Sequence, residues 1–196
     1  MIEPKPAHGV VVLAAGASRR LGHSKQLLRI DGETLVHRAV RLALTTAPAD
    51  AVLVVGADAE TVFAAARDLP IRRVDCIDWE RGMGASLRIG LAALPADCAA
   101  ALVVLCDQPA LGAEHLAALV TAWRANADRG AASSYAGRVG VPALLPRAWF
   151  AELQHDARDH GARILLERRH AQVTLVANEE LIHDIDTPED SASFAT

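Results

Sequence analysis

Two kinds of segment alternate along this chain. Segments of the first kind are apolar, mostly without alternating polar residues, and those of the second kind repeat their apolar residues at helical spacing. The apolar segments are residues 10–14, 51–55, 71–75 and 101–106. Such segments are typical of strands covered on both faces. The segments between them place apolar residues three or four positions apart, as do Leu87, Leu91 and Leu94. Alternating strands and amphipathic helices form βαβ units, so the sequence predicts an α/β fold with a doubly wound, mostly parallel sheet and helices on both faces.

The last third of the chain is less regular. Strands are predicted at residues 131–135, 141–145 and 173–176, and helices near 149–153 and 163–169. A turn with Gly137 and Gly140 separates the first two strands, which favours antiparallel edge structure in a small C-terminal region on the acceptor side. Because the sequence contains no repeat, low-complexity tract or linker, we expect residues 1–196 to form a single domain.

Composition narrows the class of protein. Apolar residues make up 52% of the 196 residues, enough for a substantial core. The net charge of −4 and the pI of about 6.0 argue against partners such as nucleic acid or an anionic membrane. No apolar segment approaches the roughly 20 residues of a membrane span, and the N-terminus lacks the regions of a signal peptide. Cys76, Cys98 and Cys106 show no zinc-ligand spacing. We therefore expect a cytoplasmic monomer whose cysteines belong to the core.

The loop after the first predicted strand combines small side chains with cations. Gly16 and Ser18 let backbone N–H groups approach a phosphate closely, and Arg20 and Lys25 supply positive charge on an otherwise acidic protein. This combination predicts a nucleoside triphosphate site, with a solvated basic turn as the alternative. The glycine spacing matches neither a P-loop nor the GxGxxG dinucleotide fingerprint, which disfavours a nicotinamide-dependent oxidoreductase.

Residues 13–25 fit the pattern Leu-Ala-Ala-Gly-x-Ser-x-Arg-x-Gly-x-x-Lys. This pattern resembles the opening signature of the cytidylyltransferase-type nucleotidyltransferases, and within the MobA-like NTP transferase superfamily it is most similar to the molybdenum cofactor cytidylyltransferase family. Further blocks follow in the same order: Gly82-Met83-x-x-Ser86-Leu87-x-x-Gly90, Cys106-Asp107-Gln108-Pro109, Gly137-x-x-Gly140-x-Pro142, Asp159-x-Gly161-Ala162-Arg163 and Asp184-Ile185-Asp186-Thr187-Pro188-Glu189-Asp190. Together the blocks span nearly the whole chain.

The resemblance implies a Rossmann-like, glycosyltransferase-A-like fold and a set of site residues. The nucleotide would be bound by Leu13, Ala14, Ala15, Gly16, Ser18, Arg20, Lys25, Gly82 and Ser86. The catalytic residues would be Arg20 and Lys25, on the β- and γ-phosphates, and Asp107. Asp107 directly follows a predicted strand, where a carboxylate suits Mg²⁺, and the resemblance favours Asp186 as a second metal ligand.

Simpler roles remain open for several of these residues. Ser18 also fits a turn, Ser86 a helix cap, and Asp107 the start of a turn before Pro109. Most of the acidic residues near the C-terminus are expected to form a solvated face, and Arg19, at a variable position of the motif, also fits a solvated side chain.

The resemblance further implies the reaction. CTP would donate CMP to the phosphate of molybdenum-bearing molybdopterin, with release of pyrophosphate. Ala15, where guanylyl-transferring relatives carry Gly, and Gln108 favour the cytidylyl branch. Leu21 and Asp78 depart from the family's usual Met and Asn. The alternatives are transfer to a sugar or polyol phosphate, and a non-catalytic protein that delivers the cofactor to a molybdenum hydroxylase.

Overall fold

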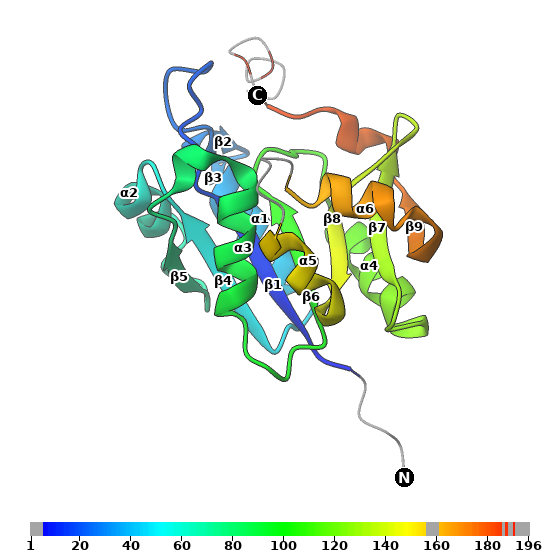
Figure 1. The fold of residues 1–196 in the computed structure, drawn as a ribbon. Coiled ribbons are helices and arrows are strands. Elements are labelled where there is room, and N and C mark those ends of the chain that lie inside the picture. The colour runs from blue at the N-terminus through cyan, green and yellow to red at the C-terminus, as the bar shows by residue number, and fades with distance from the viewer. Residues whose placement is uncertain (1–5, 156–160, 186, 188–189, 191–196) are drawn as a thin grey trace.

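The computed structural model describes residues 6–155, 161–185, 187 and 190, and its centre is a seven-stranded sheet (Figure 1). The strands are β1 (His8–Ala14), β4 (Asp50–Val55), β5 (Arg72–Asp75), β6 (Ala100–Leu105), β7 (Gly130–Tyr135), β8 (Arg138–Pro146) and β9 (Val173–Ala177). Their order is β5-β4-β1-β6-β8-β7-β9. β8 pairs antiparallel with β6 and β7, and the other pairs are parallel. The predicted mostly parallel sheet is confirmed.

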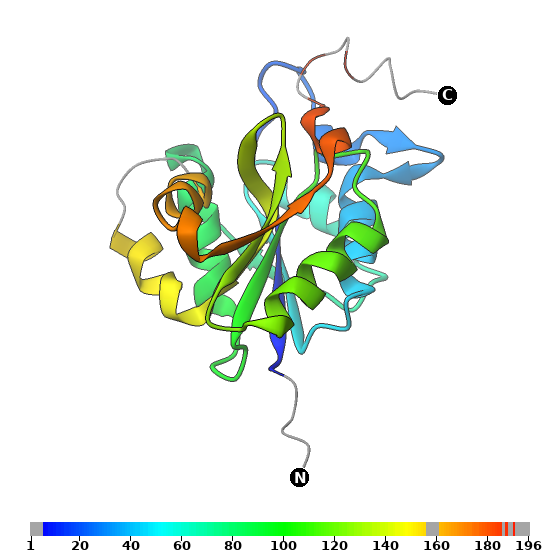
Figure 2. The same cartoon turned by 90° about the vertical axis from the view of Figure 1, so that its right-hand side faces the viewer.

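Helices cover both faces of this sheet. They are α1 (Leu35–Leu44), α2 (Ala59–Ala64), α3 (Met83–Ala93), α4 (Ala113–Ala125), α5 (Phe150–His155) and α6 (Arg163–Arg168). Figure 2 shows α1 and α4 on one side and α3, α5 and α6 on the other. Successive residues of β1 alternate between two cores: Val10 and Val12 pack with α1 and α4, while Val11 and Leu13 pack with α3, α5 and α6. The predicted double winding is thereby confirmed. No helix in the described part of the chain is long and apolar enough to span a membrane.

The C-terminal strands differ from the predicted antiparallel edge structure. Only β8 is antiparallel, and it lies inside the sheet between β6 and β7. Ala136 and Gly137, with φ of 48° and 68°, make the tight turn that reverses the chain from β7 into β8. The edge strand β9 is parallel to β7 because the intervening α5 and α6 return the chain to the same end of the sheet. Gly140 lies within β8 rather than in the turn.

The hydrophobic pattern of the sequence does not predict two short elements. One is α2, a helix of six residues. The other is the hairpin of β2 (Arg29–Ile30) and β3 (Glu33–Thr34), whose turn places Asp31 and Gly32 at positive φ. Segments of two to six residues are too short to show a hydrophobic period, so only the Asp-Gly pair signals the hairpin.

Helix α3 packs against the sheet at Gly90, with no room for a side chain. A Cβ atom there would lie 2.5 Å from Val11 Cγ1 and 2.9 Å from Val54 Cγ2. We expect Gly90→Ala to lower the free energy of unfolding by about 1–3 kcal/mol through overpacking, although alanine favours helices. Urea unfolding measures the change. The matched control is Gly112→Ala, where a Cβ meets nothing within 4 Å, and an equal loss in both variants would contradict the prediction.

Candidate active site

The candidate site lies at the carboxyl ends of β1 and β6. The chain runs outward from β1 through β4 to β5 and then returns to β6 on the other side of β1, and ligands of open α/β sheets bind where the strand order reverses in this way. A cavity of about 260 Å³ opens there. Its lining consists of Leu13, Ala14, Ala15, Gly16, Ser18, Lys25, Gln26, Trp79, Gly82, Met83, Ser86, Leu105, Cys106 and Asp107.

The structure brings most of the predicted site residues together in this cavity. Of the predicted nucleotide contacts, only Arg20 is not part of the lining; it is exposed and borders an adjoining hollow of about 220 Å³ with Ser18, Arg19 and Lys25. Asp186, the predicted second metal ligand, lies outside the described residues. Sequence reasoning missed Gln26, Trp79, Met83, Leu105 and Cys106 as lining residues.

Gln26 organises the loop that follows β1. Its side chain is buried, and its amide nitrogen donates to the carbonyl oxygens of Gly16 at 2.8 Å and Ala14 at 3.2 Å. The Ser18 hydroxyl donates to Gln26 Oε1 at 3.3 Å and accepts from the backbone N–H of Lys25 at 3.0 Å. Ser18 therefore has the turn role that was left open, and it also lines the cavity. The only sequence signal for Gln26 was its position directly after Lys25.

We expect Gln26→Ala to weaken the binding of CTP by at least about tenfold, because the carbonyl oxygens of Ala14, at the end of β1, and Gly16, in the loop after it, lose their buried donor. Isothermal titration with CTP and Mg²⁺ measures this loss. The exposed Gln172 is the control position, where alanine is expected to leave the affinity for CTP unchanged. If Gln26→Ala binds CTP as the unsubstituted protein does, Gln26 does not organise the loop.

Lys25 and Asp107 form an ion pair across the cavity. Lys25 Nζ lies 2.5 Å from Asp107 Oδ2, and the two side chains are 19% and 14% exposed. The other oxygen, Asp107 Oδ1, is buried and has no hydrogen-bond donor among the described residues. The pair thus joins the loop after β1 to the end of β6. Ile185, from the C-terminal segment, donates its backbone N–H to the Asp107 carbonyl oxygen at 3.0 Å.

Asp107 fits a divalent cation. A buried anionic oxygen without a donor is costly unless a cation or hydrogen bond compensates it, and Mg²⁺ prefers hard oxygen ligands of this kind. Within the described ranges, no three His, Cys, Asp or Glu side chains form a complete metal cluster. Mg²⁺ is usually held by one or two carboxylates together with water and substrate phosphates, and Asp107 offers one such carboxylate.

The opposite wall of the cavity comes from the start of α3. Gly82 adopts φ of 99° directly before the helix, a conformation that side chains disfavour. Ser86 lies inside the helix, buried, with its hydroxyl 3.7 Å from Cys76 Sγ, so the alternative role of a helix cap is wrong.

Burial raises the pKa of the Cys106 thiol, which therefore remains neutral and unsuited to nucleophilic attack.

Arg19 has a defined place at the rim. Its guanidinium lies 6.0 Å from the centre of the Trp79 ring and 3.2 Å from the Glu80 carboxylate. The side chain is 76% exposed, in keeping with a largely solvated residue. Trp79 also lines the cavity, so Arg19 links the loop to the opposite wall at the surface.

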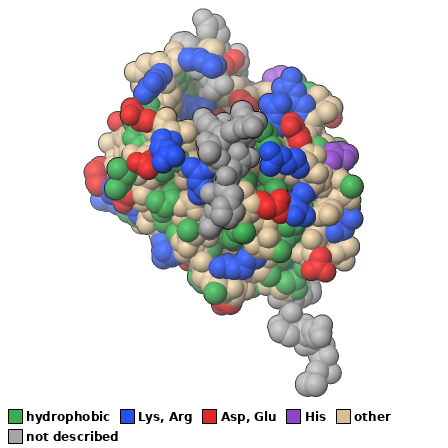
Figure 3. Space-filling model, in the orientation of Figure 1, with side chains coloured by type: hydrophobic (Ala, Val, Ile, Leu, Met, Phe, Trp, Pro, Cys, Tyr) green, Lys and Arg blue, Asp and Glu red, His purple; other side chains and the backbone are tan. Residues whose placement is uncertain are grey.

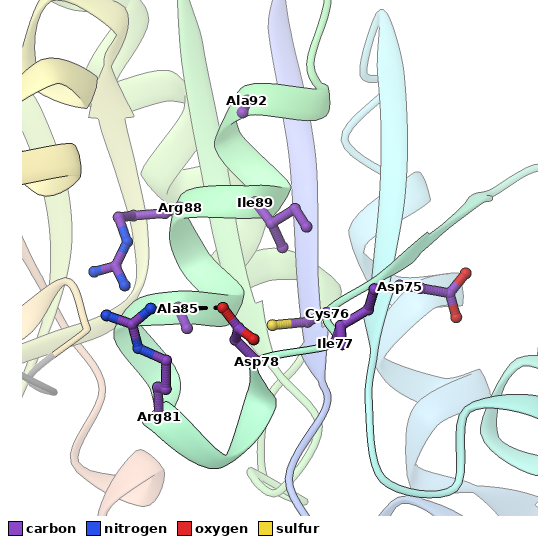
Figure 4. A pocket seen from close by; sticks show the side chains of 9 residues that line it. All are labelled: Asp75, Cys76, Ile77, Asp78, Arg81, Ala85, Arg88, Ile89 and Ala92. Carbon is purple, nitrogen blue, oxygen red and sulfur yellow. Dashed lines mark ion pairs between the residues drawn. The ribbon is translucent and has the colours of Figure 1, made fainter.

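A separate hollow of about 550 Å³ lies on the outer side of α3 (Figure 4). Asp78 and Arg81 form an ion pair there, and Ile77 and Ile89 are exposed. Figure 3 shows acidic and basic side chains interspersed on the face that carries α3. None of the predicted site residues lines this hollow, so its side chains serve as controls for the cavity at β1 and β6.

Comparison with known proteins identifies the family. The model of the MobA-like NTP transferase domain matches residues 10–173. The chain belongs to this family. This is a family of NTP transferases, so the predicted MobA-like superfamily, the α/β fold and the nucleotidyltransferase class of enzyme are confirmed.

Two relatives align along nearly their whole length. The chain is 35% identical over 191 residues to "Nicotine blue oxidoreductase" of Paenarthrobacter nicotinovorans, covering 91% of this chain and 92% of that protein. It is 33% identical over 192 residues to "Purine catabolism protein PucB" of Bacillus subtilis, covering 92% of each.

Solved structures of Rv0371c from Mycobacterium tuberculosis H37Rv share the fold. One has a TM-score of 0.80 at 28% identity, covering 95% of this chain and 97% of that one. A complex of Rv0371c with manganese has a TM-score of 0.73 at 26% identity, covering 96% and 97%.

Proposed function

We propose that this protein transfers CMP from CTP to the terminal phosphate of molybdenum-bearing molybdopterin, forming the cytosine dinucleotide cofactor and pyrophosphate. We further propose that it does so in the cytoplasm as a single-domain monomer that uses Mg²⁺. The observation that carries the proposal is the pairing of Lys25 with Asp107 where the loop after β1 meets the end of β6. A cation and a carboxylate facing each other in this cavity supply the two groups that transfer from a triphosphate requires.

The residues support a reaction without a general base. A phosphate monoester, with a second pKa of about 6, is already largely dianionic near neutral pH. One of its oxygens attacks the α-phosphorus of CTP, and the bond from that phosphorus to the bridging oxygen breaks. Pyrophosphate leaves with the electron pair. The main barrier is repulsion between anions, so cations and positioning matter most.

The loop after β1 provides those cations. Lys25 leaves the Asp107 carboxylate for the β- and γ-phosphates, and the exposed Arg20 approaches them from the adjoining hollow. Both stabilise the charge that gathers on the leaving pyrophosphate. The backbone of residues 15–18 lies against the phosphates because its side chains are small. The remaining proposed nucleotide contacts are Leu13, Ala14, Ala15, Gly16, Ser18, Gly82 and Ser86.

Asp107 is the proposed ligand for Mg²⁺, joined by Asp186, which lies outside the described residues. The assignment is supported by Asp107 Oδ1, which is buried and has no donor in the described part of the chain. When bound, the ion would neutralise phosphate charge. The Asp107 carboxylate would fix the position of this cation at the end of β6, next to the phosphates that the loop after β1 holds.

Of the two residues that favoured the cytidylyl branch in the sequence, only Ala15 lies in the lining of the cavity. Ala15 is buried in the cavity lining, so its methyl group narrows the space available to a base. Gln108 does not line the cavity; its amide nitrogen donates to the Val141 carbonyl oxygen at 3.2 Å and ties the segment after β6 to β8. Gln108 therefore acts on the position of β8 and not on the lining of the cavity.

The test incubates the protein with each nucleoside triphosphate, Mg²⁺ and molybdenum-bearing molybdopterin, and measures pyrophosphate. Release with CTP and this acceptor is expected. If only UTP or ATP supports release, or only a sugar or polyol phosphate accepts the nucleotide, the proposed substrates are wrong. If nothing releases pyrophosphate while the molybdenum hydroxylase still gains cofactor, delivery without catalysis is the better account. A parallel titration with NAD(P)H tests the activity in the name of the Paenarthrobacter relative.

A further inference from the structure

A second cavity, of about 640 Å³, lies beside the first. It is formed by the tip of the β7–β8 hairpin, the start of α6 and the segment that carries Ile182 and Asp184. Two side chains, Met83 and Leu105, line both cavities. The cavities therefore adjoin at these two residues, close to the end of β6 that leads to Asp107.

Met83 is the adaptable part of this boundary. It is the first residue of α3 and is 46% exposed, whereas Leu105 is the last residue of β6, a strand paired on both sides. A methionine side chain is unbranched and has three rotatable bonds, so it adjusts to its surroundings more readily than leucine in a strand.

Gly161 makes room for Met83. A Cβ atom at Gly161 would lie 3.0 Å from Met83 Sδ and 3.3 Å from Met83 Cγ, so the thioether occupies the space that a side chain would take. Gly161 also has φ of 53°, which glycine tolerates best. Two sequence blocks of the family resemblance thus contact each other here, one at the start of α3 and one just before α6.

The lining of the second cavity indicates its ligand. The ring of Tyr135 and the side chains of Val139 and Ile164 provide apolar and aromatic surface, and Arg138 provides a guanidinium group. Two acids, Glu167 and Asp184, also line it, and Glu167 pairs with Arg163 at 2.8 Å. Aromatic surface beside a guanidinium suits a flat heterocycle that carries a phosphate monoester.

We propose that Met83 is a specificity-determining residue, the adaptable wall past which the phosphate of a heterocyclic phosphomonoester reaches the nucleotide from the second cavity. This inference rests on the proposed function, because a nucleotide must occupy the first cavity. For transfer, the attacking oxygen must come within about 3–3.5 Å of the α-phosphorus, so the two substrates have to meet at the boundary. The side chain at that boundary then selects the acceptor.

Direct binding tests this role without turnover. The probe is the phosphate ester of 6-hydroxymethylpterin, a fluorescent flat heterocycle with a phosphate monoester, and its anisotropy is measured with a non-hydrolysable CTP analogue and Mg²⁺ present. We expect Met83→Ala to raise the Kd of the probe by at least about fivefold and to change the Kd of the CTP analogue by less than about twofold. Ile89→Ala, on the same helix but in the outer hollow, is expected to change neither.

A double-mutant cycle tests the contact with Gly161. Gly161→Ala displaces the Met83 side chain and is expected to weaken probe binding, but to have a smaller effect when Met83 is already alanine. Equal effects in both backgrounds would overturn the role of this contact. The proposal is also overturned if Met83→Ala leaves the Kd of the probe unchanged, or changes the Kd of the CTP analogue by the same factor.

The two proposals fail in different ways. If the unsubstituted protein binds the probe but releases no pyrophosphate with CTP and molybdenum-bearing molybdopterin, the proposed function fails and the role of Met83 stands on the binding data. If the unsubstituted protein does not bind the probe at millimolar concentration, the inference about the second cavity is wrong, whatever the turnover.

Discussion

Replacing Asp107 with alanine is expected to lower kcat for pyrophosphate release from CTP by at least about a thousandfold. The change removes the carboxylate whose buried Oδ1 has no donor among the described residues, and with it the proposed metal ligand. It also removes the partner that holds Lys25 beside the end of β6. Steady-state measurement of pyrophosphate with CTP and the molybdopterin acceptor gives kcat.

The fold should survive this substitution. Asp107 Oδ1 accepts no hydrogen bond from the described residues, and Lys25, 19% exposed in its side chain, can turn towards solvent. Thermal unfolding is therefore expected to be nearly unchanged. Asp107→Asn keeps the shape and removes the charge, so it should be almost as inactive as Asp107→Ala. Asp75→Ala, at an exposed carboxylate of the outer hollow, should retain full activity. A kcat for Asp107→Ala within tenfold of the unsubstituted value would remove Asp107 from the mechanism.

Replacing Lys25 with alanine should reduce kcat/KM for CTP by about a hundredfold or more, the second largest effect. The ammonium group lies in the cavity beside Asp107 and is the proposed contact of the phosphates that leave. Lys25→Arg keeps the charge but changes its shape, so partial activity is expected. The measurement is the dependence of the rate of pyrophosphate release on CTP concentration.

Arg19→Ala provides the matched control for Lys25. Arg19 belongs to the same loop, but its guanidinium lies at the Trp79 ring and the Glu80 carboxylate on the surface. Its removal is expected to change kcat/KM by less than about fivefold, as for exposed charges in general. Comparable losses for Arg19→Ala and Lys25→Ala would show that the loop acts by overall charge alone. Because Lys25 and Asp107 form a pair, the double variant should lose less than the product of the two single losses.

The local pattern of apolar residues was sufficient to predict most strands of the sheet. The apolar segments that became β1, β4 and β6 are covered on both faces, and such burial leaves a continuous apolar run in the sequence. The small residues and cations after β1 likewise predicted a phosphate site, and the structure places Gly16, Ser18 and Lys25 around one cavity. The roles proposed for these residues in catalysis stay predictions.

Local pattern could not predict which distant segments pair with each other. An apolar strand such as β8 has the same composition whether it lies at an edge or between β6 and β7, so its position inside the sheet was not predicted. Gln26 shows the same limit for a side chain, because the carbonyl groups that accept its hydrogen bonds belong to Gly16 and Ala14, ten and twelve residues earlier in the chain.

The α/β class, the parallel strands and the loop of small and basic residues after β1 could be predicted from local pattern, since each follows from burial or backbone conformation over a few neighbouring positions. The folded chain was needed to show that Lys25 faces Asp107, 82 positions away, and that Met83 lies against Gly161 where two cavities meet. The physical reason is that such contacts depend on strand order and helix packing, which arise from the whole chain rather than from any one segment.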